Sequence, residues 1–209
     1  YHQHMGARSS IQSMESLFGR RLMVASVDLP GHLDALVERM ESVGSLTADS
    51  IIDDMTLLPY YVAFQPQRIR DEARQALKSG QTDGLMMQLG MTAFRPGRVT
   101  KLRFCGTCLS QMHGEYGEAY WRRDHQLPGV LVCPDHARVL QESQVSLAAL
   151  SRHIFVTPTA KSCPWNAKPL LKDPSSKLLP ILQRLAQASR KLLESPERAK
   201  TLEQWTKHY

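Results

Sequence analysis

Four residues in the middle of the chain have the types and the spacing of a metal site. Cys105 and Cys108 form a CxxC pair, and Cys133 and His136 form a CxxH pair further along the chain. A two-residue spacing lets both side chains of a pair point at one ion, so two such pairs supply four ligands. Thiolate and imidazole ligands favour zinc over magnesium or calcium. We therefore predict one structural zinc ion, because four protein ligands leave no position for a catalytic water.

The zinc ion has a structural consequence for the segment that carries it. The segment that carries the ligands, from Cys105 to His136, is too short to build a sufficient hydrophobic core of its own, so we expect loss of the metal to unfold it. The alternative is three buried cysteines beside an unrelated histidine. Cys163 has no second ligand two residues away and is expected to be a core or surface thiol. His113 and His125 compete with His136 as ligands only weakly, since neither lies two residues from a cysteine.

Asp124 and His125 raise the question of catalysis, because an imidazole beside a carboxylate is a common acid–base unit. Adjacent residues point in different directions on a helix or a strand, so Asp124 cannot easily orient the ring of His125. The chain also contains no GxSxG, P-loop or HExxH motif. We predict that the protein is not an enzyme.

Basic residues cluster within and just before the metal segment. The candidate DNA-binding residues are Arg98, Lys101, Arg103, Arg122 and Arg123. Guanidinium groups suit phosphate because they donate two hydrogen bonds in one plane. The sequence thus favours double-stranded DNA as a partner, and a solvated basic face is the alternative.

Three aromatic residues lie close to these arginines: Tyr116, Tyr120 and Trp121. Their rings could stack on bases, but in so small a module we expect them to form its hydrophobic filling.

Composition sets limits on the class of protein. The 209 residues carry a net charge of +6, and 42% of them are hydrophobic, which is ordinary for a globular protein. Acidic residues outnumber basic ones over residues 1–89, whereas residues 90–209 are basic. Four cysteines are too few for a disulfide scaffold and fit a reducing, cytoplasmic location. No apolar run is long enough to span a membrane, so we expect no membrane partner.

Hydrophobic periodicity and punctuation predict the elements that position the site. Apolar residues recur at helical spacing before residue 90, and Gly19 and Gly80 stand where helices would end. Pro66 would open one helix, and Pro180 is tolerable only in the first turn of another. We predict a mainly α protein. Its parts are a helical, helix-turn-helix-like domain (residues 1–99), a CCCH zinc-finger module (100–142), and a connector with C-terminal helices (143–209).

The motifs carry a family resemblance. CxxC followed by YGEAYWRRDHQLPGVLVCPDH, and preceded by LPGHLDALVERM and LLPYYVAFQP, resembles the TniQ/TnsD family of bacterial transposon target-selection proteins. The resemblance runs from about Leu17 to the end of the chain, and the zinc-module pattern is its most specific part. It implies that the family's zinc ligands correspond to Cys105, Cys108, Cys133 and His136.

The resemblance also implies a function. It suggests a protein that recognises an insertion target on DNA and recruits an AAA+ ATPase transposition regulator, TnsC-like, to it. The opening family helix and the long C-terminal DNA-binding region have no counterpart in this sequence, so we expect the N-terminal part of a longer protein. The rival hypothesis is a purely protein-interaction zinc module that docks the ATPase, with DNA read by a C-terminal region outside this chain.

Overall fold

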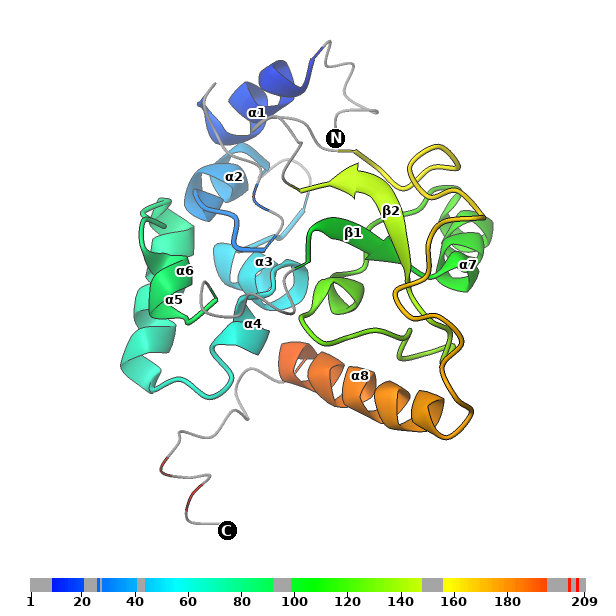
Figure 1. Cartoon of the computed structure of the whole chain (residues 1–209). Helices are drawn as coiled ribbons and strands as arrows, with labels where there is room; N and C mark the ends of the chain where they lie inside the picture. Colours follow the sequence, from blue (N-terminus) through cyan, green and yellow to red (C-terminus); the bar gives the residue numbers. More distant parts are fainter. Residues whose placement is uncertain are drawn as a thin grey trace. The chain divides into compact units, whose positions relative to one another are not determined.

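The computed structural model describes residues 9–20, 26, 28–40, 44–91, 99–147, 156–194, 203 and 206. The chain divides into two compact units, and each is described here by itself. The described part of the first unit is helical before residue 92 (Figure 1). Its helices are α1 (Ser10–Phe18), α2 (Leu33–Met40), α3 (Ala48–Met55), α4 (Leu58–Tyr61), α5 (Gln67–Ser79) and α6 (Leu85–Gln88).

The predicted punctuation of these helices is confirmed. Gly19 ends α1 and Gly80 ends α5, both in the left-handed conformation that glycine adopts without strain, with φ of 68° and 84°. Pro66 is the residue before the first turn of α5. In the C-terminal helix α8 (Leu178–Glu194), Pro180 lies in the first turn, where its missing N–H leaves no helical hydrogen bond unmade.

Helix α2 is the centre of the first unit, because it packs against α1, α3 and α5. The core between these helices is aliphatic, and Leu33, Ile52, Leu58 and Leu77 are its most buried members. Burial of each such side chain contributes about 1.5–3 kcal/mol relative to exposure. This unit therefore has a hydrophobic core of its own.

The LPGHL element has a structural role in that unit. His32 has a φ of 59°, and a Cβ at Gly80 would lie 2.2 Å from the imidazole ring of His32. Gly31 also lies close to Gly80, since a Cβ on Gly31 would lie 3.1 Å from the Gly80 Cα. The ring of His32 thus covers the glycine that ends α5, and any side chain at position 80 would displace it.

The LLPYYVAF element is held by Arg70 from α5. The Arg70 Nε donates to the carbonyl oxygens of Val62 (3.2 Å) and Gln65 (3.1 Å), and Nη2 donates to that of Ala63 (3.0 Å). One guanidinium thereby satisfies three carbonyl groups of the turn that follows α4.

The second unit is built on a two-stranded antiparallel sheet, β1 (Lys101–Phe104) with β2 (Gln141–Ser146) (Figure 1). Between the strands come α7 (Gly106–Tyr116) and the 3-10 helix η3 (Arg123–Gln126). The free edge of β2 binds a later segment, because the Glu142 and Gln144 amides donate to the carbonyls of Lys168 (2.9 Å) and Ser162 (2.8 Å). The unit thus extends beyond the predicted module.

The predicted fold class, mainly helical with a small metal module, is confirmed by this architecture. The boundaries after residues 99 and 142 stay predictions, as does a helix-turn-helix role for the first unit. The short helix expected at the C-terminus, from residue 201, falls almost entirely outside the described residues. Among the described helices, none is both long enough and apolar enough to cross a bilayer.

Candidate metal centre

The two ligand pairs are presented by two tight backbone features. Cys105 follows β1 directly and is the residue before the first turn of α7, so Cys108 lies one helical turn further on. Cys133 and His136 lie on a turn whose ends pair through Val132 and Val139. In this turn the Cys133 amide donates to the Arg138 carbonyl (2.8 Å), and the Ala137 amide donates to the Cys133 carbonyl (3.0 Å). Ala137 closes the turn with a φ of 52°.

These features bring the four predicted ligand atoms together. The three sulfurs and the His136 Nδ1 all lie within 4.8 Å of one another. The Cys108 Sγ is 3.6 Å from the Cys133 Sγ, and the Nδ1 lies 3.7, 3.3 and 3.4 Å from the sulfurs of Cys105, Cys108 and Cys133. Bonds of about 2.3 Å to sulfur and 2.0 Å to nitrogen in a tetrahedron separate ligand atoms by about 3.5–3.8 Å. The cluster therefore matches the size of a tetrahedral zinc site.

The neighbouring thiols shift one another's pKa values. Hydrogen bonds from Cys108 and then Cys133 lower the pKa of Cys105, against the opposing effect of burial. The pKa of Cys108 is raised, first by its hydrogen bond with Cys105 and next by that with Cys133. The three thiols thus form one hydrogen-bonded cluster.

Arg122 places positive charge beside these sulfurs. Its Nη1 lies 3.5 Å from the Cys108 Sγ. Its Nε and Nη2 form a fork with the carboxylate of Asp124 at 3.1 and 2.7 Å, and Nη1 also pairs with Asp135 at 2.8 Å. A thiolate-rich site carries net negative charge, so a guanidinium at this distance compensates it and fixes the surrounding carboxylates.

Helix α8 is fixed to the CxxH turn through the peptide that follows Cys133. The side-chain amides of Gln183 and Gln187 both donate to the Pro134 carbonyl at 3.1 Å. One turn further along, the Arg190 Nη1 pairs with the Asp135 carboxylate at 2.5 Å. These three residues recur at helical spacing, so one face of α8 contacts the residues between two metal ligands.

His113, His125 and Cys163, which the sequence offered as further candidates, lie outside the cluster. His125 is buried with its Nε2 4.0 Å from the Cys108 Sγ, and burial lowers the pKa of His125 to about 4, so its ring is neutral. The same Nε2 is 4.0 Å from Asp124, too far for a hydrogen bond. His113 is exposed on α7. Cys163 is buried against Phe104 and Ala167, as a core thiol.

The structure describes four of the five predicted DNA-binding residues and separates them into three groups. Arg103 is buried, and its guanidinium donates to the carbonyls of Leu127 (3.3 Å) and Val130 (3.1 Å). Arg122 belongs to the carboxylate network beside the sulfurs. Lys101 on β1 and Arg123 on η3 are both half-buried, and Arg98 lies outside the described residues. Arg103 and Arg122 thus have internal contacts that sequence reasoning did not anticipate.

The expectation for the aromatic residues was wrong in two of three cases. Tyr116 and Tyr120 are 58% and 57% exposed, and they lie next to each other with ring centroids 6.5 Å apart. Trp121 is half-buried, packs against the core around Phe104, and donates from Nε1 to the Val156 carbonyl at 2.6 Å. A left-handed Gly117 after α7 turns the chain between Tyr116 and Tyr120.

Comparison with known proteins places this geometry in a family. The family model described as TniQ matches residues 1–140, a range that contains all four residues of the metal cluster. The chain belongs to the TniQ family. It is also 31% identical, over 212 aligned positions, to the Transposon Tn7 transposition protein TnsD of Escherichia coli. That alignment covers 99% of this chain and 39% of the relative, so the chain spans about two fifths of the relative's length.

The TniQ match includes the residues of the metal cluster and ends before α8. The contacts of α8 with the CxxH turn, which sequence reasoning also missed, therefore lie outside the family match. One signal for them was present in the sequence: Gln183, Gln187 and Arg190 recur at helical spacing among leucines. A polar stripe of that kind is ordinarily solvent-exposed, and only the structure shows that it faces the Pro134 peptide.

Proposed function

We propose that this chain is the target-selection and adaptor part of a transposition protein, built around a structural zinc module. The observation that carries the proposal is the TniQ match over residues 1–140, which includes the complete Cys3His cluster. The similarity to a transposition protein over almost the whole chain supports the same function.

The metal in this proposal is zinc, held by Cys105, Cys108, Cys133 and His136. The interatomic distances support a tetrahedral ion with four protein ligands, which is the arrangement of structural zinc sites. Cys105 and Cys108 would hold the ion from the start of α7, and Cys133 and His136 would hold it from the CxxH turn, so a bound ion would link these two segments. We propose no catalytic role, because such a site leaves no open coordination position for substrate.

We propose that double-stranded DNA is one partner of the second unit. Lys101 and Arg123 are the predicted phosphate contacts that stay in the proposal among the described residues, and Arg98 stays with them on its sequence position. Arg103 and Arg122 are reassigned to internal structure, because their donors already bind carbonyls or carboxylates. An AAA+ ATPase transposition regulator is the proposed protein partner.

The reassignment of two arginines favours a second candidate function. In this alternative the zinc module serves only as a protein-interaction surface for the ATPase, and the DNA is bound by other regions of a longer protein. Fewer available guanidinium groups mean fewer counterions released on DNA binding, and therefore weaker binding to DNA at physiological salt.

A gel shift with the 209-residue chain separates the two candidates. We expect retardation of a duplex without the ATPase, and we expect Lys101→Ala with Arg123→Ala to weaken it and to flatten its dependence on salt. Arg184→Ala removes one positive charge from an exposed site on α8 and serves as the control for a change of net charge. Retardation only in the presence of the ATPase would contradict direct DNA binding and support the alternative.

A further inference from the structure

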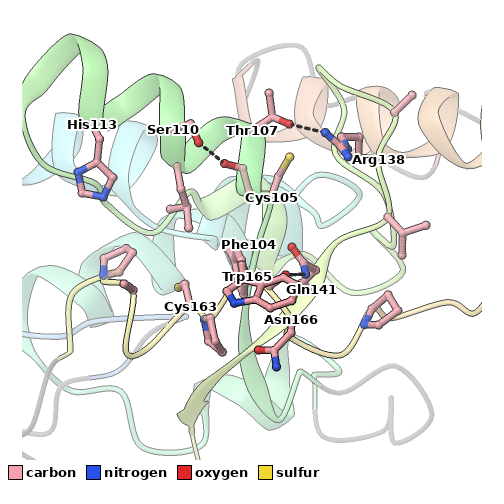
Figure 2. Close-up of a pocket in the computed structure, with 18 of the residues that line it drawn as sticks. Phe104, Cys105, Thr107, Ser110, His113, Arg138, Gln141, Cys163, Trp165 and Asn166 are labelled. Atoms are coloured by element: carbon pink, nitrogen blue, oxygen red, sulfur yellow. Dashed lines mark hydrogen bonds between the residues drawn. The ribbon is translucent and has the colours of Figure 1, made fainter.

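The second unit contains an open groove of about 1220 Å³, and Cys105, one of the four predicted metal ligands, is among its lining residues (Figure 2). One wall is α7 with the end of the CxxH turn, and the other is the segment from Pro158 to Asn166. Most of the lining is apolar, and its floor includes Phe104, Leu109 and Cys163. A concave, mainly apolar surface with a few polar groups is typical of ligand sites.

Trp165 stands in this groove with 91% of its surface exposed. Its indole N–H has no partner among the described residues, yet its backbone is held firmly. The Gln141 side-chain amide donates to the carbonyls of Trp165 (3.4 Å) and Ala167 (3.1 Å), and the Ala167 amide donates to the Pro164 carbonyl (3.0 Å). Trp165 thus presents an exposed aromatic ring from a hydrogen-bonded stretch of backbone, and tryptophan dominates many interfaces.

The charge around the groove is positive. Arg138 lines it and donates from Nη1 to the Thr107 hydroxyl (3.2 Å); its remaining donors have no partner in the described part of the chain (Figure 2). Asp173 also lines the groove, whereas the segment carrying Trp165 has four exposed lysines that lie outside the lining and are not paired with a carboxylate among the described residues. The lysines are Lys161, Lys168, Lys172 and Lys177.

We propose that this groove binds an extended peptide segment of a protein partner, in which an apolar or aromatic side chain neighbours acidic residues. The apolar side chain packs on Trp165 and the floor, while a carboxylate meets Arg138, and the lysines outside the lining make the surrounding segment basic. Duplex DNA fits less well, because phosphates would lose water against an apolar floor. Single-stranded nucleic acid could stack on one indole ring but would leave the apolar floor uncovered. The proposal goes beyond DNA binding and does not depend on it.

The test uses the full chain and a phage-displayed library of random short peptides. Selection on the wild-type protein, followed by removal of phage that bind Trp165→Ala, should enrich sequences that combine an apolar residue with Asp or Glu. A labelled synthetic peptide of the enriched sequence should bind in fluorescence anisotropy, and Trp165→Ala should weaken it at least about tenfold. Tyr120→Ala, which removes another exposed aromatic ring from the same unit, should leave the affinity unchanged.

Three results would overturn the proposal. The first is no enrichment on the wild-type protein over Trp165→Ala, and the second is an enriched sequence without acidic residues. The third is that single-stranded oligo(dT) or a duplex binds the wild-type protein and displaces the peptide, and that Trp165→Ala abolishes this binding. That result would assign the groove to nucleic acid. Both variants should have the zinc content and the circular dichroism of the wild type, which excludes misfolding. We expect this result because both rings are exposed.

Discussion

Replacing Arg122 by alanine should destabilise the second unit strongly. The Asp124 side chain is only 7% exposed, and the Arg122 fork neutralises it from 2.7 and 3.1 Å. Removing one partner of a fully buried ion pair costs about 3–5 kcal/mol. Arg122 is 24% exposed, and the Arg190 Nη1 lies 3.9 Å from Asp124 as a second cation, so we expect about 2–3 kcal/mol here.

The assay is a urea titration of the zinc-loaded protein. Trp121 reports on the second unit when Trp165→Phe and Trp205→Phe remove the other tryptophans. With a slope of about 1 kcal/mol per molar urea, the midpoint should fall by about 2–3 M. Arg122→Lys keeps the charge without the fork and should lie between the wild type and Arg122→Ala.

Arg184→Ala is the matched control, since Arg184 is exposed on α8, and it should change the free energy of unfolding by less than about 0.5 kcal/mol. If Arg122→Ala were no more destabilising than Arg184→Ala, the network around Asp124 would not stabilise the unit, and the structural role assigned to Arg122 would be wrong.

Three further predictions address other parts of the molecule. Gly80→Ala should lower the free energy of unfolding in urea by at least about 1 kcal/mol more than Gly84→Ala, because both glycines have a positive φ but only a Cβ at Gly80 meets His32. Equal losses in the two variants would refute the packing of His32 on Gly80. Gln183→Ala with Gln187→Ala should cost about 1–2 kcal/mol and speed amide exchange in α8, since Pro134 loses both side-chain donors; exchange like that of Arg184→Ala would count against this contact. Hydrogen bonds from Lys78 and then Arg74 lower the pKa of Asp49, so the first unit should lose stability as pH falls through that lowered pKa. The thermal midpoint of Asp49→Asn should therefore vary less than that of the wild type between about pH 2 and 6. Parallel curves for the two proteins would show that Asp49 does not stabilise the folded state in its charged form.

The sequence predicted local features well, because each depends on a few neighbouring residues. Gly19 and Gly80 end helices since only glycine adopts a left-handed φ without strain, and the paired ligands reveal themselves by spacing. The predicted ligands do converge, which a repeated two-residue spacing makes geometrically easy.

Contacts between distant segments could not be predicted in the same way. The sequence suggested that Arg122 belongs to a DNA-binding face, whereas in the structure it pairs with Asp124. An arginine that binds phosphate and one that forms an internal ion pair cannot be told apart in the sequence. Burial of Arg103 depends on carbonyls supplied more than twenty residues later. Trp165 lies in a loop that Gln141 contacts from a distant strand, and the residues around Trp165 in the sequence do not predict that its side chain is exposed.

X-ray absorption spectroscopy of the purified chain, with metal quantified by mass spectrometry, tests the central claim most directly. The account predicts one zinc ion per chain with three sulfur neighbours at about 2.3 Å and one nitrogen at about 2.0 Å. Cys108→Ser should reduce the sulfur count and loosen the second unit while the aliphatic core of the first persists. Zinc far below one per chain, or a first shell dominated by oxygen, would contradict the account.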